Sequence, residues 1–252
     1  MMDMGEDMKG RPVLVTGAAR GIGLAIARAF GRRGARVAVN DRGEDAAAAA
    51  ASLLRGEGLD AFAVAGDVAD EAACVAIVAA ACDGDGGLAA LVNNAAIGRM
   101  APLADHRRGY WDKVLAVNLL APFQLVRAAE AALVRAGGAV VNIASAAAYG
   151  MHNQYSYDVS KGGLITLGRS LALELGPRGV RVNSVCPGYV DTDMLRADDG
   201  LRQQAEKMAR SLPLRRLARP DEIAEAVVWL ASDDAAYVTG HALFVDGGWI
   251  RP

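Results

Sequence analysis

Short aliphatic and β-branched runs alternate along this chain with longer stretches in which apolar residues recur every three or four positions. The short runs predict strands and the longer stretches predict helices. The expected strands are residues 12–16, 36–40, 61–65, 88–93, 139–144, 180–186 and 242–245. The expected helices between them are residues 22–33, 44–55, 70–82, 110–135, 155–175 and 221–231.

This alternation of strands with longer helices indicates parallel βαβ units. The sequence therefore predicts an α/β fold, a single-domain Rossmann-like doubly wound parallel sheet of about seven strands with helices on both faces. Residues 1–9 are expected to form a flexible tail, and residues 10–252 one domain. The polar, arginine-rich stretch 191–219, interrupted by Pro213, is expected to be an irregular, mobile lid.

The composition is typical of a globular chain. Its 252 residues are 53% hydrophobic, and a net charge of −2 gives no general attraction to nucleic acid or to an anionic membrane. No apolar run combines the length and the lack of polar residues of a membrane span. Cys74, Cys82 and Cys186 form no Cys-x-x-Cys pair, and the three histidines are scattered. We therefore expect a soluble cytoplasmic protein without a metal site.

A glycine-rich turn follows the first expected strand and begins the first helix. In Gly17-Ala18-Ala19-Arg20-Gly21-Ile22-Gly23, the first glycine permits a tight turn and the second lets the backbone approach a pyrophosphate. The third glycine lets the helix pack against the strand. The helix N-terminus then presents free N–H groups to the phosphates, so the segment predicts a dinucleotide site.

The second expected strand ends at Asn40-Asp41-Arg42. An acid about 20 residues beyond the glycine turn can accept both hydroxyls of the adenosine ribose and repels a 2′-phosphate, which favours NAD. Arg20 and Arg42 oppose this interpretation because a guanidinium can pair with that phosphate. NAD is therefore the expected cofactor, and NADP stays open.

A second constellation lies where the helix 155–175 begins. The spacing of Tyr157 and Lys161 places both side chains on one helix face, one turn apart. An ammonium beside a phenol is expected to lower the phenol's pKa and make it a useful general acid and base. Lys161 is one of only four lysines among 27 basic residues, so arginine is the usual basic residue of this chain but does not stand here.

These motifs occur in a characteristic order. The glycine turn, Asn93-Asn94-Ala95, Asn118, Ser145, Tyr157 with Lys161, and Pro187-Gly188 follow one another as in the short-chain dehydrogenase/reductase family. The chain resembles that family from about residue 9 to its C-terminus. The resemblance implies hydride transfer between a nicotinamide cofactor and a small or medium alcohol or ketone, and it also implies a homotetramer.

The resemblance also implies roles for individual residues. Tyr157 would exchange the proton with the substrate oxygen, Lys161 would lower its pKa and hold the nicotinamide ribose, and Ser145 would hydrogen-bond the substrate. Asn118 would hold a water that relays the proton. The expected cofactor-binding residues are Gly17, Arg20, Gly21, Ile22, Gly23, Asp41, Arg42, Asp67, Val68, Asn93, Ala95, Tyr157, Lys161, Pro187, Gly188, Val190 and Thr192.

The chain departs from the family pattern in three places. Ala96 stands where the family usually has glycine after Asn-Asn-Ala, and the family's serine usually lies 13 residues before the tyrosine, where this chain has Ala144. Because Ser145 carries the hydroxyl, we infer a one-residue deletion in the loop 146–155. That loop holds two further tyrosines, Tyr149 and Tyr155, which are expected to form pocket wall.

Two alternatives to an NAD-dependent dehydrogenase or reductase stay open. The first is an NADPH-dependent reductase of 3-oxoacyl thioesters, which belongs to the same family. The second is a catalytically silent dinucleotide sensor, although the intact set of Ser145, Tyr157 and Lys161 argues against it. The substrate pocket is expected at residues 97–100, 146–155, Tyr189 and the lid, since ligands bind at the carboxyl ends of parallel strands.

Overall fold

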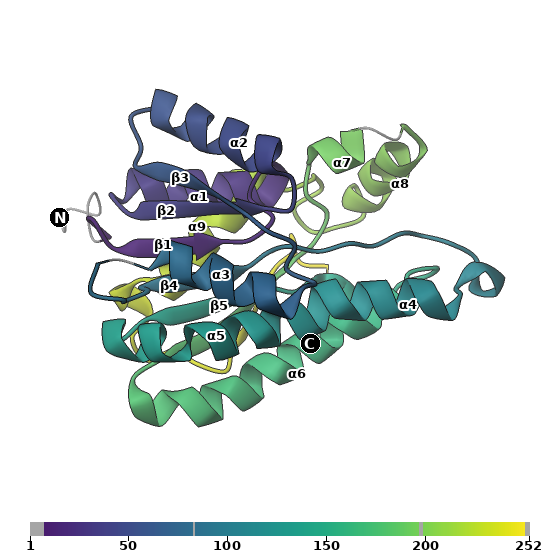
Figure 1. Cartoon of the computed structure of the whole chain (residues 1–252). Coiled ribbons are helices and arrows are strands. Elements are labelled where there is room, and N and C mark those ends of the chain that lie inside the picture. The colour runs from purple at the N-terminus through teal and green to yellow at the C-terminus, as the bar shows by residue number, and fades with distance from the viewer. Residues whose placement is uncertain (1–7, 83, 197–198, 250–252) are drawn as a thin grey trace.

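The computed structural model describes residues 8–82, 84–196 and 199–249, and one parallel sheet runs through its centre (Figure 1). Seven strands pair in the order β3-β2-β1-β4-β5-β6-β7. Their bounds are β1 Pro12–Val15, β2 Arg36–Asp41, β3 Ala61–Ala65, β4 Ala90–Asn93, β5 Ala139–Ile143, β6 Arg181–Pro187 and β7 Ala242–Val245. The predicted doubly wound parallel sheet is confirmed.

Helices connect the strands and cover both faces of the sheet. Their bounds are α1 Gly21–Arg32, α2 Glu44–Gly56, α3 Glu71–Ala81, α4 Arg108–Leu115, α5 Ala121–Ala136, α6 Tyr155–Leu175, α7 Asp193–Arg196, α8 Asp199–Ala209 and α9 Pro220–Ala231. Short helical turns lie at η1 Leu103–Asp105, η3 Ala146–Tyr149, η4 Gly176–Arg178 and η5 Asp233–Ala235, and a π-helical turn, η2, spans Ala116–Leu120.

The two faces of the sheet have separate cores. Residues of α1, α2 and α9 pack on one face around Phe30, Leu54 and Val227. Residues of α3, α5 and α6 pack on the other face around Ile77 and Leu125. In Figure 1, α3 and α5 lie in front of the strands and α1 and α9 lie behind them. Because both faces are covered, the central strands are mostly buried, as in β1, whose four residues are all buried, whereas the edge strand β7 has no fully buried residue.

Chain order reverses between β1 and β4, which are neighbours at the middle of the sheet. A crevice opens at such a reversal because the connections on its two sides leave in opposite directions. The glycine turn after β1, the loop after β4 and the loop after β5 all lie at this carboxyl edge. The fold therefore brings together the three segments that carry most of the sequence motifs.

Two expectations about irregular segments need correction. Met8, assigned to the flexible tail, is 1% exposed and its N–H donates to the carbonyl of Arg33; residues 1–7 lie outside the described residues. The segment 191–219, expected to be irregular, contains α7 and α8 and leaves the body beside the bridge between Val190 and Ala218. Apolar positions such as Leu195 and Ala205, both buried, explain why this polar stretch forms helices.

The helix expected at residues 110–135 is longer and interrupted. Helical structure runs from Arg108 to Ala136, with the π-helical turn in its middle. This stretch is also long and apolar enough to pass a length and composition test for a membrane span. Core helices pass the same test, and here Leu125, Ala129 and Leu133 are buried in the core beneath the sheet. Length and composition are therefore weak evidence for a span.

Candidate active site

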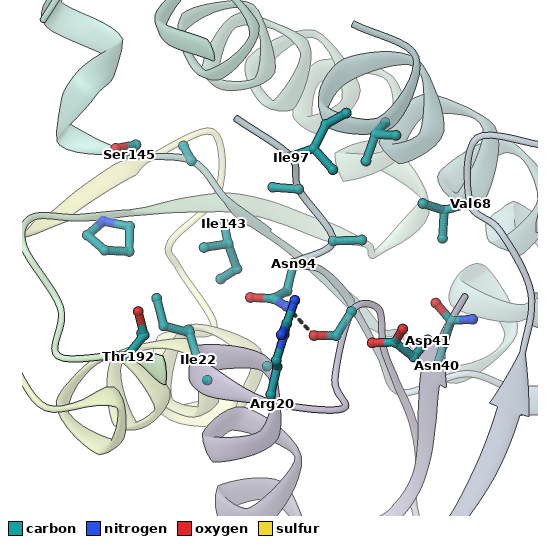
Figure 2. Close-up of a pocket in the computed structure, with 18 of the residues that line it drawn as sticks. Arg20, Ile22, Asn40, Asp41, Val68, Asn94, Ile97, Ile143, Ser145 and Thr192 are labelled. Carbon is teal, nitrogen blue, oxygen red and sulfur yellow. Dashed lines mark hydrogen bonds between the residues drawn. The ribbon is translucent and has the colours of Figure 1, made fainter. Parts of the chain in front are cut away.

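A cavity of about 470 Å³ lies at the carboxyl edge of the sheet, where the chain order reverses. It is lined by the glycine turn, the ends of β2 and β3, the loop after β4, the end of β5, the start of α6 and the segment after β6. Figure 2 shows these side chains arranged around one opening, with Arg20 and Asp41 towards one end and Ser145 towards the other.

The glycine turn is shaped by backbone contacts. Gly17 and Gly21 have φ values of 60° and 58°, in the left-handed region that favours glycine. A Cβ at Gly17 would lie 2.8 Å from Cα of Ala95, and one at Gly23 would lie 2.4 Å from the carbonyl oxygen of Gly17. No side chain can enter, so the backbone N–H groups at the start of α1 stay open to a phosphate. These residues fit a dinucleotide.

Asn94 holds this turn in place from the neighbouring strand (Figure 2). Its Nδ2 donates to the carbonyl oxygens of Thr16 and Gly17, at 2.8 and 3.0 Å. In return, the hydroxyl of Thr16 accepts the N–H groups of Asn94 and Ala95. Four hydrogen bonds therefore join the loop after β4 to the glycine turn, which fixes both sides of the reversal relative to each other.

Three charged residues surround the adenosine end of the cavity. Asp41 ends β2, and Arg20 and Arg42 line the same cavity. No ion pair to Arg20 or Arg42 occurs within the described part of the chain, so both guanidinium groups are available to a ligand. The carboxylate of Asp41 accepts only a long hydrogen bond of 3.4 Å from the N–H of Gly43. The opposing charges expected from the sequence are thus brought to one place.

At the other end, α6 presents Tyr157 and Lys161 on one face. Lys161 is 2% exposed, its Nζ donates to the carbonyl oxygen of Ile143 at 2.7 Å, and it lies 5.5 Å from the centre of the Tyr157 ring. Ser145 lines the same cavity as Tyr157, and its side chain lies close enough to lower the pKa of the phenol. The one-residue-shorter spacing therefore still brings Ser145, rather than a neighbouring residue, to the tyrosine.

Burial dominates the electrostatics of this group. It raises the pKa of Tyr157, and the nearby charge of Asp158 raises it further, while the Ser145 side chain opposes both. Burial also lowers the pKa of Lys161 to about 8. The expected lowering of the tyrosine pKa by Lys161 is not what this structure shows. Burial shifts the pKa of each group more than the charge interaction between them does, because the Lys161 Nζ lies 5.5 Å from the centre of the Tyr157 ring.

Asn118 is fully buried in the π-helical turn and serves as a bridge. Its Oδ1 accepts the N–H of Ile97, and its Nδ2 donates to the carbonyl of Ile97 and to the hydroxyl of Ser160. That hydroxyl in turn donates to the carbonyl of Tyr157 at 2.7 Å. The side chain thus ties the loop after β4 to α6, and its water-holding role remains a prediction.

Most residues expected from the sequence line this one cavity. They are Gly17, Arg20, Gly21, Ile22, Gly23, Asp41, Arg42, Asp67, Val68, Ala95, Ser145, Tyr157, Lys161, Pro187, Gly188, Val190 and Thr192. Asn93 and Asn118 do not line it; Asn93 instead donates to Asn142 on the neighbouring strand, at 2.8 Å. Tyr149 and Tyr155, expected as pocket wall, also lie outside the lining: Tyr149 is 68% exposed, and Tyr155 packs edge-on against His106.

Several lining residues were missed. They are Asn40, Gly66, Asn94, Ala96, Val117, Ile143 and Ala144, whereas Ile97, which also lines the cavity, was expected in the substrate pocket. Each lies within a few residues of a predicted one, at or just after the end of a strand or on the helix that follows, so proximity to a strand end was the available signal. Gly98, within the expected pocket range 97–100, lies close to the tyrosine, since a Cβ there would lie 2.7 Å from the Tyr157 ring. Among the described residues, no cluster of three or more His, Cys, Asp or Glu could hold a metal.

Comparison with known proteins agrees with this geometry. A family model described as enoyl-(acyl carrier protein) reductase matches residues 17–250. D-threitol dehydrogenase of Mycolicibacterium smegmatis is 41% identical over 251 residues, covering 98% of this chain and 96% of the relative. A 3-oxoacyl-(acyl-carrier-protein) reductase of Staphylococcus aureus is 38% identical over 242 residues, covering 94% and 97%.

A solved structure is also similar to this chain over nearly its whole length. A provisionally assigned NAD(P)-dependent gluconate 5-dehydrogenase from Beutenbergia cavernae, crystallised with bound NADP at low occupancy, superposes with a TM-score of 0.87. It is 38% identical in sequence, and the match covers 96% of this chain and 97% of that one.

The chain belongs to the short-chain dehydrogenase/reductase family. It is an oxidoreductase that transfers hydride between a nicotinamide dinucleotide and a hydroxyl or carbonyl group, as predicted from its sequence motifs.

Proposed function

We propose that the protein is an NAD-preferring dehydrogenase of a small polyhydroxylated alcohol, with Ser145, Tyr157 and Lys161 as its catalytic residues and Asn118 as their support. One observation carries this proposal: the three side chains meet in the cavity that the glycine turn also lines. A dinucleotide laid along that cavity from Asp41 would reach the tyrosine with its far end.

The protein's own residues handle the proton. A dinucleotide held in the cavity would accept the hydride in oxidation and supply it in reduction. In oxidation the phenolate of Tyr157 takes the proton of the substrate hydroxyl, and in reduction the phenol returns it to the carbonyl oxygen. The Ser145 hydroxyl donates a hydrogen bond to the same oxygen and stabilises its developing negative charge. The Lys161 ammonium would hold the nicotinamide ribose when the dinucleotide is bound.

The substrate class rests on the relatives and on one loop. D-threitol and gluconate, named for two similar proteins, both carry several hydroxyl groups. In this chain His152, Asn153 and Gln154 provide three consecutive polar side chains between Ser145 and Tyr157. Polar side chains that meet buried hydroxyls discriminate strongly against substrates that lack them. We therefore place polyols, sugars and sugar acids ahead of simple alcohols.

Two other functions compete with this proposal. The similarity to a 3-oxoacyl-(acyl-carrier-protein) reductase favours an NADPH-dependent reductase of 3-oxoacyl thioesters as the second candidate. A dinucleotide sensor without activity is the third, and the complete set of catalytic side chains argues against it.

A panel of polyols, aldonic acids, simple alcohols and acetoacetyl thioesters, assayed with NAD(H) and NADP(H) by nicotinamide absorbance, separates these functions. Oxidation of a polyhydroxylated substrate supports the proposal, thioester reduction supports the second candidate, and no turnover across the panel supports the sensor. Tyr157→Phe is expected to lose about 1,000-fold in turnover while still binding cofactor. Tyr155→Phe, two residues away, is the matched control and should retain turnover.

The preference for NAD depends on Asp41. A 2′-phosphate beside its carboxylate would be repelled, whereas Arg20 and Arg42 would attract it. Asp41→Ser is expected to raise the affinity for NADP relative to NAD about 10-fold, which corresponds to about 1.4 kcal/mol. Titration of both dinucleotides against tryptophan fluorescence measures the ratio, with Asp45→Ser on the exposed start of α2 as control. Tighter NADP binding by the unaltered protein would reverse the assignment.

We also propose a homotetramer in a reducing compartment. Leu120 and Phe123 on the long helix are 53% and 41% exposed, as expected for a surface that another copy covers. Cys74 and Cys186 are buried free thiols. Light scattering at micromolar concentration would report the assembly.

A further inference from the structure

Asp158 follows Tyr157 directly and is an unusual residue for a protein interior. Its side chain is 8% exposed, and no ion pair involves it within the described residues. A buried carboxylate without a cation is costly, and burial accordingly raises its pKa. Its one recorded partner is the N–H of Met151, which donates to Oδ2 at 2.5 Å, while Oδ1 has no partner. The hydrogen bond from Met151 is therefore the interaction that offsets part of the cost of burying this carboxylate.

Met151 belongs to the loop Gly150–Gln154, which connects η3 to α6. The loop adopts backbone conformations that are rare for most residues, with φ of 95° at Gly150 and 67° at Asn153. Such a loop holds one shape only where its surroundings impose it. The ends of the loop are held by backbone hydrogen bonds from Gly150 to Ala147 and from Asp158 to Gln154, both at 2.9 Å. Within the loop, Asp158 accepts the N–H of Met151, and the carbonyl of Asn153 accepts the N–H of Ala101 at 3.0 Å.

These contacts join three segments around the tyrosine. Ala101 belongs to the loop that follows β4, the loop Gly150–Gln154 follows Ser145, and Asp158 lies on α6 beside Tyr157. The same β4 loop is tied to α6 through Asn118, which bonds both Ile97 and Ser160. A shift of the loop Gly150–Gln154 would therefore move the polar side chains of residues 152–154 relative to Ser145 and Tyr157.

We propose that Asp158 is a positioning residue, whose carboxylate fixes the loop Gly150–Gln154 in the shape that binds substrate. The hydrogen-bond acceptor is the required feature, because Met151 offers an N–H that no other recorded group accepts. The effect on substrate binding rests on the proposed function. The effect on the shape of the loop does not, because that shape can be measured without any substrate.

The experiment compares three variants of the full-length protein. Asp158→Asn keeps an oxygen acceptor of the same reach, Asp158→Ala removes it, and Asp158→Ser replaces it with a hydroxyl that is too short to reach Met151. Ser156→Ala is the matched control, because the Ser156 hydroxyl is equally buried and has no partner. Hydrogen exchange of peptides covering residues 150–155 measures the loop, and steady-state kinetics on the best substrate measures KM and kcat.

Loss of the acceptor is expected to speed exchange of the Met151 amide about 10-fold and to raise KM about 10-fold. A change of this size corresponds to the loss of one charge-assisted hydrogen bond. The value of kcat and the dissociation constant of the dinucleotide should change less than about threefold, since the proton-transfer group and cofactor cavity stay intact. Asp158→Asn and Ser156→Ala should behave like the unaltered protein in both measurements.

Unchanged exchange and KM in Asp158→Ala and Asp158→Ser would overturn the proposal, as would Asp158→Asn behaving like Asp158→Ala. If Asp158→Ala does not fold, the comparison of Asp158→Ser with Asp158→Asn decides the question. If no compound of the panel is turned over, the proposed function fails, but the exchange measurement still supports or refutes the role of Asp158.

Discussion

The two ends of the cavity are built by different means. At the dinucleotide end, glycines let backbone pack against backbone, with Gly17 against Ala95 and Gly23 against the carbonyl of Gly17, and the side chains of Asn94 and Thr16 add hydrogen bonds to this packing. At the substrate end, side chains hold the loops through the hydrogen bonds of Asn118 and Asp158. Backbone packing suits the dinucleotide, which is the same molecule for many enzymes. Loops held by side chains suit the substrate, because single substitutions there can alter which substrate binds.

The most severe test of this comparison is Gly23→Ala. The added Cβ would lie 2.4 Å from the carbonyl oxygen of Gly17 and 2.5 Å from Nδ2 of Asn94, so the glycine turn must shift. We expect dinucleotide affinity to fall at least about 100-fold and stability to fall by about 1–3 kcal/mol. Calorimetric titration and urea unfolding measure the two effects.

Gly56→Ala is the matched control, because nothing lies within 4 Å of a Cβ at that helical position. It should leave dinucleotide binding unchanged and add about 0.5–1 kcal/mol of stability. Normal binding by Gly23→Ala would show that the turn adapts and that the proposed contrast between the two ends is wrong.

Lys161→Arg tests the catalytic side chains where the two ends meet. The lysine is 2% exposed and its Nζ contacts the carbonyl of Ile143, so a broad planar guanidinium has no room to occupy the same position. We expect turnover to fall about 100-fold. Lys113→Arg makes the same change at an exposed position of α4 and should have no effect. Near-normal turnover of Lys161→Arg would mean that any cation suffices there.

The charge of Lys161 also predicts how stability depends on pH. Burial lowers its pKa to about 8 from an ordinary value of 10.5. Between these values the unfolded chain holds a proton that the folded protein has released, so this group makes stability rise with pH. The penalty of burying its charge is complete below about pH 8 and disappears above the ordinary lysine pKa.

Lys161→Met removes this charge and should therefore be more stable than the unaltered protein at pH 7, on the order of 2 kcal/mol. The gap should close as pH rises to 10.5. Urea unfolding of both proteins across this range measures the difference, and subtraction removes the contributions of other groups. A gap that does not depend on pH would show that Lys161 keeps its proton equally well in both states.

The smallest expected effect lies behind the dinucleotide end. The carboxylate of Asp70 caps α3 by accepting the N–H groups of Ala72 and Ala73, at 2.8 and 3.2 Å. Asp70→Ala should reduce stability by about 1 kcal/mol, and Asp70→Ser should restore most of it. Dinucleotide binding should stay the same in both variants, because α3 supports the sheet rather than the glycine turn. A change in binding would mean that the backbone-built end depends on helix capping.

The sequence predicted local patterns better than contacts between distant segments. The glycine turn, Asp41 and the pair of Tyr157 and Lys161 are local patterns, because each depends on spacing within one turn or one helix. Asn94 was missed as a lining residue because its partners Thr16 and Gly17 are 77 or more positions away. The lid helices were missed because a few buried positions, such as Leu195, outweigh a polar composition.

By itself the sequence determined the order and type of the elements, the parallel sheet, and which helix carries the tyrosine and lysine. Periodicity and spacing are sufficient for these features, because they follow from the geometry of single strands and helices. Tertiary structure decided that Ser145 faces the tyrosine, that Asn118 bridges Ile97 and Ser160, and that burial raises the pKa of Tyr157. Those features depend on distances and desolvation between distant segments, which exist only once the sheet has brought them together.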